Sequence, residues 1–157
     1  MNADPRVMEH FPALMTRGES DALVDRIEEG FEENGFGLWA VEVAEGAGSG
    51  SFAGFVGLAR CPDQMPFSPA VEVGWRLAAE FWGRGFATEA GRASLGFGFE
   101  ELGLDEIVSF TFTGNAPSRA VMERLGMHHD PAEDFEHPLV AEGHRIRPHV
   151  LYRLQAA

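Results

Sequence analysis

The sequence predicts one α/β domain, because segments with strand character alternate along the chain with segments of helical periodicity. A length of 157 residues allows a single compact domain with a core, so residues 1–157 are assigned to one domain. Hydrophobic side chains make up 45% of the residues, which is too apolar for a disordered chain. The chain is therefore expected to fold as one globular unit.

The N-terminal part is predicted to form a helix followed by a β-hairpin. Thr16 and Glu19 have the spacing of a capping box, and residues 20–33 carry apolar side chains at every fourth position. These side chains are Leu23, Ile27 and Phe31. Residues 37–43 and 52–60 have strand character and flank a loop rich in Gly and Ser, so they are expected to pair as a hairpin.

A strand, a long helix and another strand are predicted for the middle of the chain. The strand covers residues 71–77 and leads into a Gly-rich segment. The helix is expected over residues 84–102, where small residues three or four apart allow its backbone to lie close to a sheet. The next strand is expected over residues 107–113.

The C-terminal part is predicted to contain a shorter helix, a long loop and a final strand. The helix is opened by Asn115 and ended by Gly126, which are residue types that favour the two ends of a helix. Residues 130–148 contain three prolines and are expected to form a connecting loop. The final strand is expected over residues 149–154.

The charge and composition of the chain exclude several kinds of partner. Twelve basic side chains against 25 acidic ones give a net charge of −13, which repels nucleic acid and favours a cationic ligand. The apolar stretches are far too short to span a membrane, so neither a nucleic acid nor a membrane is expected as a partner. One cysteine excludes an intrachain disulfide, and without a signal-peptide pattern a cytoplasmic location is predicted.

The absence of lysine excludes two kinds of chemistry. All 12 basic residues are arginine, so neither a Schiff-base lysine nor a Walker-type phosphate loop is present. The six histidines lack the spacing of a metal-binding helix and have no cysteine partners, so no metal is expected.

The strongest chemical signal is the Gly-rich segment Trp82–Thr88 between the strand at 71–77 and the long helix. Glycines let the backbone approach a ligand, and the N–H groups and dipole at the start of a helix favour a diphosphate. Arg84 would add a full positive charge there. An alternative interpretation is an ordinary strand-to-helix turn that uses glycine only for its geometry, with Arg84 in solvent.

Several segments, taken in order, resemble the GNAT acyltransferases, and in particular their Rim-type branch of ribosomal-protein N-terminal acetyltransferases. They are residues 71–77 (VEVGWRL), 82–90 (WGRGFATEA), 115–118 (NAPS) and 122–127 (MERLGM). Each segment is weak alone, and together they are specific. The resemblance covers nearly the whole chain and implies the GNAT fold, in which a twisted, mostly antiparallel central sheet is flanked by helices.

The resemblance implies that the co-substrate is acetyl-CoA. In the family the Gly-rich loop holds the pyrophosphate, the preceding strand pairs with the pantetheine arm, and the helix that begins with Asn lines the thioester end. Cofactor-binding roles are thereby implied for Trp75, Leu77, Trp82, Gly83, Arg84, Gly85, Phe86, Ala87, Thr88 and Asn115. Asn115 is expected either to contact the cofactor arm or to cap its helix, and Trp82 stands where the family usually has Gln or Arg.

Two catalytic residues are suggested by position. Glu72 matches the place where some members of the family have a carboxylate base, with an exposed strand residue as the alternative interpretation. The tyrosine that many relatives use as the acid for the leaving sulfur would fall at Met122, which has no proton to donate. Ser118 is a candidate donor in its place, although capping chemistry at the helix start is an equally ordinary role and is slightly favoured.

The function that these features predict is acetyl transfer from acetyl-CoA to a primary amine, on a protein N-terminus or a small molecule, by direct attack on the thioester. The net charge suits a cationic amine. One alternative is a CoA or acyl-CoA sensor without catalysis, and another is an interaction module that has lost cofactor binding.

The resemblance also implies that the usual first strand of the fold is missing. In relatives a strand and a helix normally precede the segment that resembles residues 2–5 of this sequence. A sheet without that strand exposes an unpaired edge, which favours association, such as a homodimer, or lowers stability.

Overall fold

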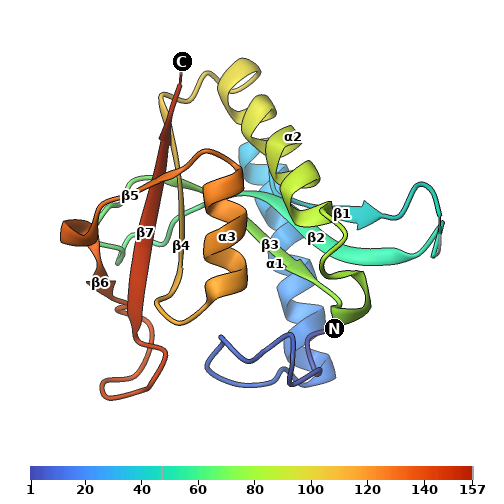
Figure 1. Ribbon diagram of the computed structural model, residues 1–157, viewed down its shortest axis with the longest axis horizontal. Helices are drawn as coiled ribbons and strands as arrows, with labels where there is room; N and C mark the ends of the chain where they lie inside the picture. Colours follow the sequence, from blue (N-terminus) through green and yellow to red (C-terminus); the bar gives the residue numbers. More distant parts are fainter. Residues whose placement is uncertain (47, 157) are drawn as a thin grey trace.

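The described residues form one seven-stranded sheet with helices on both of its faces (Figure 1). The computed structural model describes residues 1–46 and 48–156. The strands are β1 (Leu38–Glu42), β2 (Phe52–Arg60), β3 (Val71–Leu77), β4 (Glu106–Phe112), β5 (His128–His129), β6 (Phe135–Glu136) and β7 (Pro148–Gln155). The α-helices are α1 (Arg17–Asn34), α2 (Phe86–Glu100) and α3 (Ala116–Arg124), and the 3₁₀ turns are η1 (Ala79–Phe81) and η2 (Pro131–Glu133).

The sheet has the order β1-β2-β3-β4-β7-β5, with β6 also paired to β7. All neighbouring strands are antiparallel except β3 and β4, which are parallel and joined by a single pair, Glu72 with Val108. The predicted mostly antiparallel sheet is therefore confirmed. Within the described part of the chain no strand lies beyond β1, which forms one edge of the sheet.

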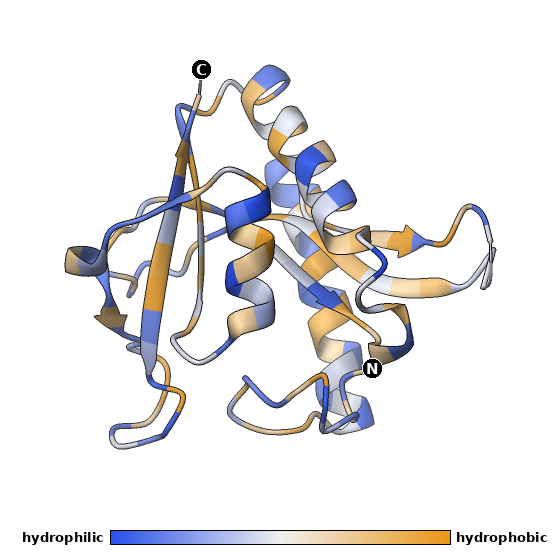
Figure 2. Ribbon diagram, viewed as in Figure 1, coloured by the Kyte–Doolittle hydropathy of each residue, from blue (hydrophilic) through white to orange (hydrophobic). Residues whose placement is uncertain are grey.

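The helices lie on different sides of the sheet. In Figure 1, α2 and α3 lie in front of the sheet and α1 lies behind it. Along α2 and α3 apolar residues alternate with hydrophilic ones in Figure 2, as expected for helices that bury one face. The main core forms where α2 and α3 cover the strands, and its fully enclosed side chains include Leu58, Val73, Ile107, Met122 and Tyr152.

A glycine of α2 lets this helix lie against the sheet. A Cβ atom at Gly98 would lie 2.5 Å from the side chain of Ile107 and 3.1 Å from that of Leu58. The small residues predicted to allow close packing of the long helix therefore include one at which a larger side chain would force Ile107 to move.

The element boundaries agree with the prediction within a few residues, and two differences matter. The helix expected over 84–102 begins only at Phe86, because Gly85 takes a left-handed conformation (φ 86°) and caps it. The loop expected over 130–148 contains the turn η2 and the strand β6, and the strand β5 precedes it. Both strands have only two residues, which is too short for any alternating pattern to predict.

The capping box predicted from Thr16 and Glu19 is present. The Thr16 side chain accepts a hydrogen bond from the Glu19 main chain, and the Glu19 carboxylate accepts one from the Thr16 main chain at 2.7 Å. No helix in the described part of the chain is both long and apolar enough to cross a membrane.

Candidate active site

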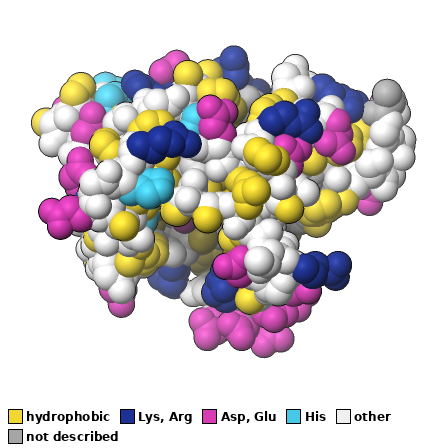
Figure 3. Space-filling view, turned by 90° about the horizontal axis from the view of Figure 1, so that it is seen from below, with side chains coloured by type: hydrophobic (Ala, Val, Ile, Leu, Met, Phe, Trp, Pro, Cys, Tyr) yellow, Lys and Arg dark blue, Asp and Glu magenta, His cyan; other side chains and the backbone are white. Residues whose placement is uncertain are grey.

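A cavity of about 1070 Å³ opens where β3 and β4 separate. Its walls come from β3, the loop after η1, the start of α2, α3, residues 6–12 and residues 137–149. Figure 3, which views the molecule from below, shows the surface hollowed at this end, with hydrophobic side chains in the hollow. The cavity is large enough for an extended ligand, and its mostly apolar lining also contains polar side chains such as Glu72, Arg76 and Ser118.

The separation of the two strands leaves a gap at the centre of the sheet. After the pair of Glu72 with Val108, the hydroxyl of Ser109 donates to the main-chain oxygen of Val73 at 2.9 Å. A side-chain hydrogen bond thus takes the place of the next main-chain hydrogen bond between the two strands. Beyond it the parallel pairing stops, so the main chain of β3 at Trp75 and Leu77 has no partner on the β4 side.

The loop between η1 and α2 forms an open cradle at one end of the cavity. Gly83 and Gly85 have positive φ angles of 71° and 86°, which only glycine adopts readily. No side chain caps the start of α2, so the first N–H groups of this helix are free to bind a ligand. Such a helix start favours an anion, as the sequence predicts.

Nearly all the residues predicted to bind the cofactor line this one cavity. They are Trp75, Leu77, Trp82, Gly83, Gly85, Phe86, Ala87, Thr88 and Asn115. Arg84 is different, because its side chain lies outside the lining and its guanidinium stacks 4.7 Å from the ring centroid of Phe86. The Trp82 indole donates to the main-chain oxygen of Leu77 at 2.9 Å and so helps to hold the loop against β3.

Glu72 lies in the same cavity, on the strand that borders the gap. It is half-buried rather than exposed, and it is one of the residues that line the cavity. Removal of the carboxylate from water raises the pKa of Glu72 to about 7. A carboxyl group with this pKa can take up and release a proton near neutral pH.

At the start of α3, the side chains of Asn115 and Ser118 make different contacts and have different roles. Asn115 caps the helix: its side-chain oxygen accepts a hydrogen bond from the Ser118 main chain at 3.3 Å, and its amide donates to the Thr111 hydroxyl at 2.8 Å. The Ser118 hydroxyl takes no part in this cap. It accepts a hydrogen bond from the Trp75 indole at 3.3 Å, which leaves its own proton free for another acceptor.

Met122 also lines the cavity and is almost fully enclosed, with 1% of its surface exposed. The position to which the resemblance assigns the tyrosine is therefore filled by an apolar side chain.

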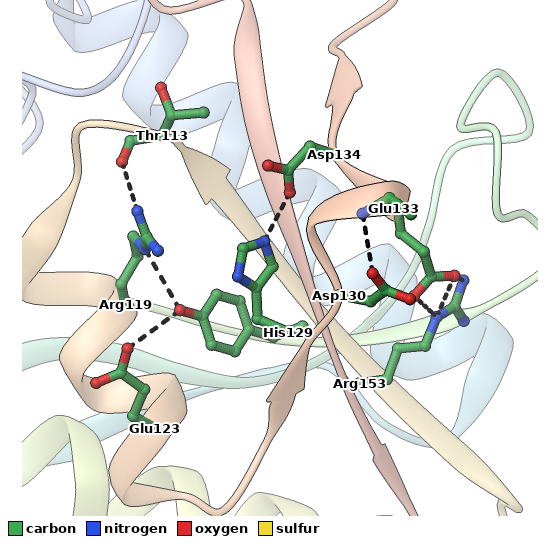
Figure 4. Close-up of polar contacts among 10 residues, drawn as sticks. Thr113, Arg119, Glu123, His129, Asp130, Glu133, Asp134 and Arg153 are labelled. Atoms are coloured by element: carbon green, nitrogen blue, oxygen red, sulfur yellow. Dashed lines mark hydrogen bonds and ion pairs between the residues drawn. The ribbon is translucent and has the colours of Figure 1, made fainter.

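A network of polar contacts fixes α3 against the rest of the sheet (Figure 4). Arg119 donates to the main-chain oxygen of Thr113 at 3.2 Å and to the hydroxyl of Tyr152 at 3.3 Å, and Tyr152 in turn donates to Glu123 at 3.2 Å. His129 stacks on the Tyr152 ring with centroids 5.0 Å apart. The only tyrosine of the sequence thus supports the helix that lines the cavity.

The far end of the cavity contains residues for which no sequence motif predicts a role. Phe110, His137 and His149 pack together there, with the two imidazole centroids 4.7 Å apart. Desolvation lowers the pKa of His149 to about 4, so this ring is neutral at physiological pH. Phe110 comes from β4, His149 from the strand predicted at 149–154 and His137 from the segment predicted as a loop, and no local pattern indicates that they meet.

Arg76 lines the cavity as well and was predicted only as part of the strand at 71–77.

No group of three metal-ligating side chains is found in residues 1–46 and 48–156.

Comparison with known proteins identifies the family. The model of the acetyltransferase (GNAT) domain matches residues 1–128, and the chain therefore belongs to the GNAT acetyltransferase family. The chain is also similar in sequence to a protein of the ribosomal branch of this family. A putative ribosomal N-acetyltransferase of Bacillus subtilis, YdaF, is 39% identical over 77 residues, which are 49% of this chain and 40% of that protein.

Other curated relatives match longer segments. The uncharacterized protein YkkB of Bacillus subtilis is 32% identical over 126 residues, which cover 80% of this chain and 70% of that protein. The FsC-acetyl coenzyme A-N(2)-transacetylase of Aspergillus fumigatus is 40% identical over 99 residues, and the match spans 60% of this chain and 40% of that protein.

Solved structures share the fold. An acetyltransferase of the GNAT family from Bacillus anthracis superposes with a TM-score of 0.76 over 98% of this chain and 84% of that one, at 22% identity. Spermidine N-acetyltransferase from Vibrio cholerae, solved in complex with CoA and spermine, has a TM-score of 0.71 at 19% identity and covers 98% of this chain and 85% of that one.

Proposed function

We propose that this protein transfers an acetyl group from acetyl-CoA to a primary amine by direct attack of the amine on the thioester. One observation carries the proposal: a single cavity combines an uncapped helix start, a gap in the sheet with free main-chain groups, and a carboxyl group whose pKa is about 7. The first two suit an extended cofactor that carries a diphosphate. The third suits removal of a proton from an amine.

The cofactor is proposed to lie along the gap. The N–H groups at the start of α2 and the glycines 83 and 85 bind the pyrophosphate, and the free main chain of Trp75 and Leu77 pairs with the pantetheine arm. Arg84 contributes positive charge near the loop, and its stacking on Phe86 holds it there. The thioester then lies beside β3, between Glu72 and the start of α3.

The reaction has three steps of bond making and breaking. The amine nitrogen attacks the carbonyl carbon, and the proton that it must lose passes to Glu72 directly or through water. A main-chain N–H near Trp75 stabilises the oxyanion. The carbon–sulfur bond then breaks, and the departing sulfur receives a proton through the Ser118 hydroxyl, whose own proton the Trp75 indole leaves free. Water returns a proton to Ser118 in the same step, and Glu72 releases the proton of the amine to water.

The names of two relatives support an amine acceptor. One is an N(2)-transacetylase that uses acetyl coenzyme A, and another is a spermidine N-acetyltransferase. The absence of a proton donor at Met122 is the observation that favours the alternative, a CoA-binding sensor without catalysis.

Calorimetric titration of acetyl-CoA into the protein, followed by addition of a pooled set of amines, tests the proposal. We expect binding and then turnover heat. Binding without turnover by any amine favours the sensor, and the absence of binding by any CoA species contradicts the cofactor assignment.

A matched pair of variants tests the position of the pyrophosphate. Gly85→Glu places bulk and negative charge at the start of α2 and is expected to abolish acetyl-CoA binding. Gly103→Glu is the control, because Gly103 has a similar positive φ of 63° and open space around it, but lies beyond the other end of α2. Equal affinity in both variants contradicts the assignment.

A further inference from the structure

We propose that Arg76 binds a carboxylate of the acceptor, so that the acceptor is a primary amine that also carries a carboxylate group. This inference rests on the proposed function, because it names the class of amine that enters the same cavity. It starts from a guanidinium group that lines the cavity and has no anionic partner among residues 1–46 and 48–156.

The surroundings of Arg76 are neutral and largely aromatic. Its guanidinium carbon lies 4.1 Å from the ring centroid of Phe11 and 5.4 Å from that of Phe55. Nη1 donates to the side-chain oxygen of Asn2 at 3.0 Å and contacts the sulfur of Met15 at 3.7 Å. These contacts fix the plane of the guanidinium without neutralising its charge.

No carboxylate compensates this charge within the described part of the protein. The ion pairs found there do not include Arg76, and its Nε atom is enclosed without a hydrogen-bond partner. Burial lowers the pKa of Arg76 to about 10, so the group remains charged at neutral pH. An unpaired buried cation is costly, and an anionic ligand group at its accessible end would offset that cost.

Arg76 and Glu72 point to the same side of β3, because side chains four residues apart on a strand share a face. Their Cα atoms are about 13 Å apart at the usual rise of a strand. Between them lies Gly74, where an added Cβ would meet no atom within 4 Å. The floor of the cavity is therefore open between the two charged groups.

This arrangement suits a ligand with opposite charges at its two ends. An amine placed toward Glu72 lies beside the thioester, and a carboxylate on the same molecule extends over Gly74 toward Arg76. Of the other arginines that line the cavity, Arg6 is already paired with Asp4 at 2.7 Å, and Arg124 lies at the C-terminal end of α3, away from β3. Arg76 is therefore the cation that distinguishes an amino acid from a polyamine, although the net charge of the chain favours cationic ligands.

The separation of the two groups leaves the length of the acceptor open, so the test uses three probes. L-methionine, 4-aminobutyrate and 6-aminohexanoate, each compared with its uncharged amide, are titrated into the protein saturated with CoA. No acetyl group is present, so binding is measured without turnover. We expect at least one acid to bind 10- to 100-fold more tightly than its amide, as for a charge-assisted hydrogen bond.

Variants of Arg76 decide whether this residue is responsible. Arg76→Gln is expected to bring the ratio of acid to amide affinity close to one, and Arg76→Lys to keep part of the preference. Arg60→Gln on the neighbouring strand is the control, because Arg60 is exposed and bonds to Asn34 outside the cavity. With acetyl-CoA present, Arg76→Gln should raise KM for the acid and leave kcat nearly unchanged.

The outcomes separate this inference from the proposed function. Equal binding of acid and amide, binding of neither, or a preference that survives in Arg76→Gln overturns the role of Arg76, even if other amines are acetylated. Tight binding of an acid that is never acetylated supports the carboxylate site and instead contradicts the proposed acetyl transfer.

Discussion

Replacement of Glu72 by glutamine should make the stability of the protein less dependent on pH. The wild-type carboxyl group has its pKa raised by desolvation from 4.5 to about 7. In the unfolded chain it ionises near 4.5, so the folded state binds an extra proton between these two pH values. Stability from this group is thus fully present below pH 4.5 and is lost as the pH rises to about 7.

The size of this effect follows from the shift. A change of about 2.5 pKa units corresponds to roughly 3 kcal/mol of unfolding free energy, which is an upper value because the group retains some contact with solvent in the cavity. Glutamine has nearly the same shape and does not ionise. The difference in stability, variant minus wild type, should therefore increase by up to about 3 kcal/mol from pH 4.5 to pH 8.

Urea denaturation at pH 5, 6, 7 and 8 measures this difference, with the exposed Glu100→Gln as control. A difference that stays constant over this range refutes the argument that the Glu72 carboxyl is desolvated. Activity provides a second readout. In the wild type kcat/KM should rise as the pH passes about 7, because Glu72 must lose its proton to act as a base. In Glu72→Gln this rise of kcat/KM with pH should disappear, and kcat should be lowered on the order of 10²- to 10⁴-fold.

Two further predictions concern packing and the leaving group. Gly57→Ala should cost about 3 kcal/mol or more, because its Cβ would lie 2.1 Å from the main-chain oxygen of Gly37, whereas Gly74→Ala on the paired strand should change stability by less than about 1 kcal/mol. Similar unfolding midpoints for the two variants would contradict this packing. Ser118→Ala should lower kcat on the order of 10²-fold at unchanged acetyl-CoA affinity, and an unchanged kcat would exclude Ser118 as the proton donor to the sulfur.

Much of the fold was predictable because its signals are local. Thr16 and Glu19 form the expected capping box, and the strands at 52–60 and 71–77 have the predicted boundaries. These elements depend on side-chain spacing and on the residues that end them. The strands β5 and β6 escaped prediction because they exist only through pairing with β7, a contact between distant parts of the chain.

The part of the cavity proposed to hold the cofactor has a signature in the sequence, whereas the part proposed to hold the acceptor has none. Glycines 83 and 85 follow a strand and begin a helix, so the cradle has a short, continuous signature. Arg76 has no such signature, since an arginine on a strand is ordinary until its lack of an ion-pair partner is visible. The packing of His137 against His149 likewise depends on tertiary structure.

The gap between β3 and β4 has a consequence for how such a protein changes over evolution. The surface proposed to face the cofactor consists largely of peptide groups, which every amino acid carries. Substitutions at many positions therefore leave the binding of one common donor molecule intact. The opposite wall is built by side chains of residues 6–12 and 137–149, and substitutions there can fit the cavity to new acceptors. The same fold can thus acquire a new acceptor specificity through substitutions in one wall of the cavity, while the other wall keeps its binding of the donor.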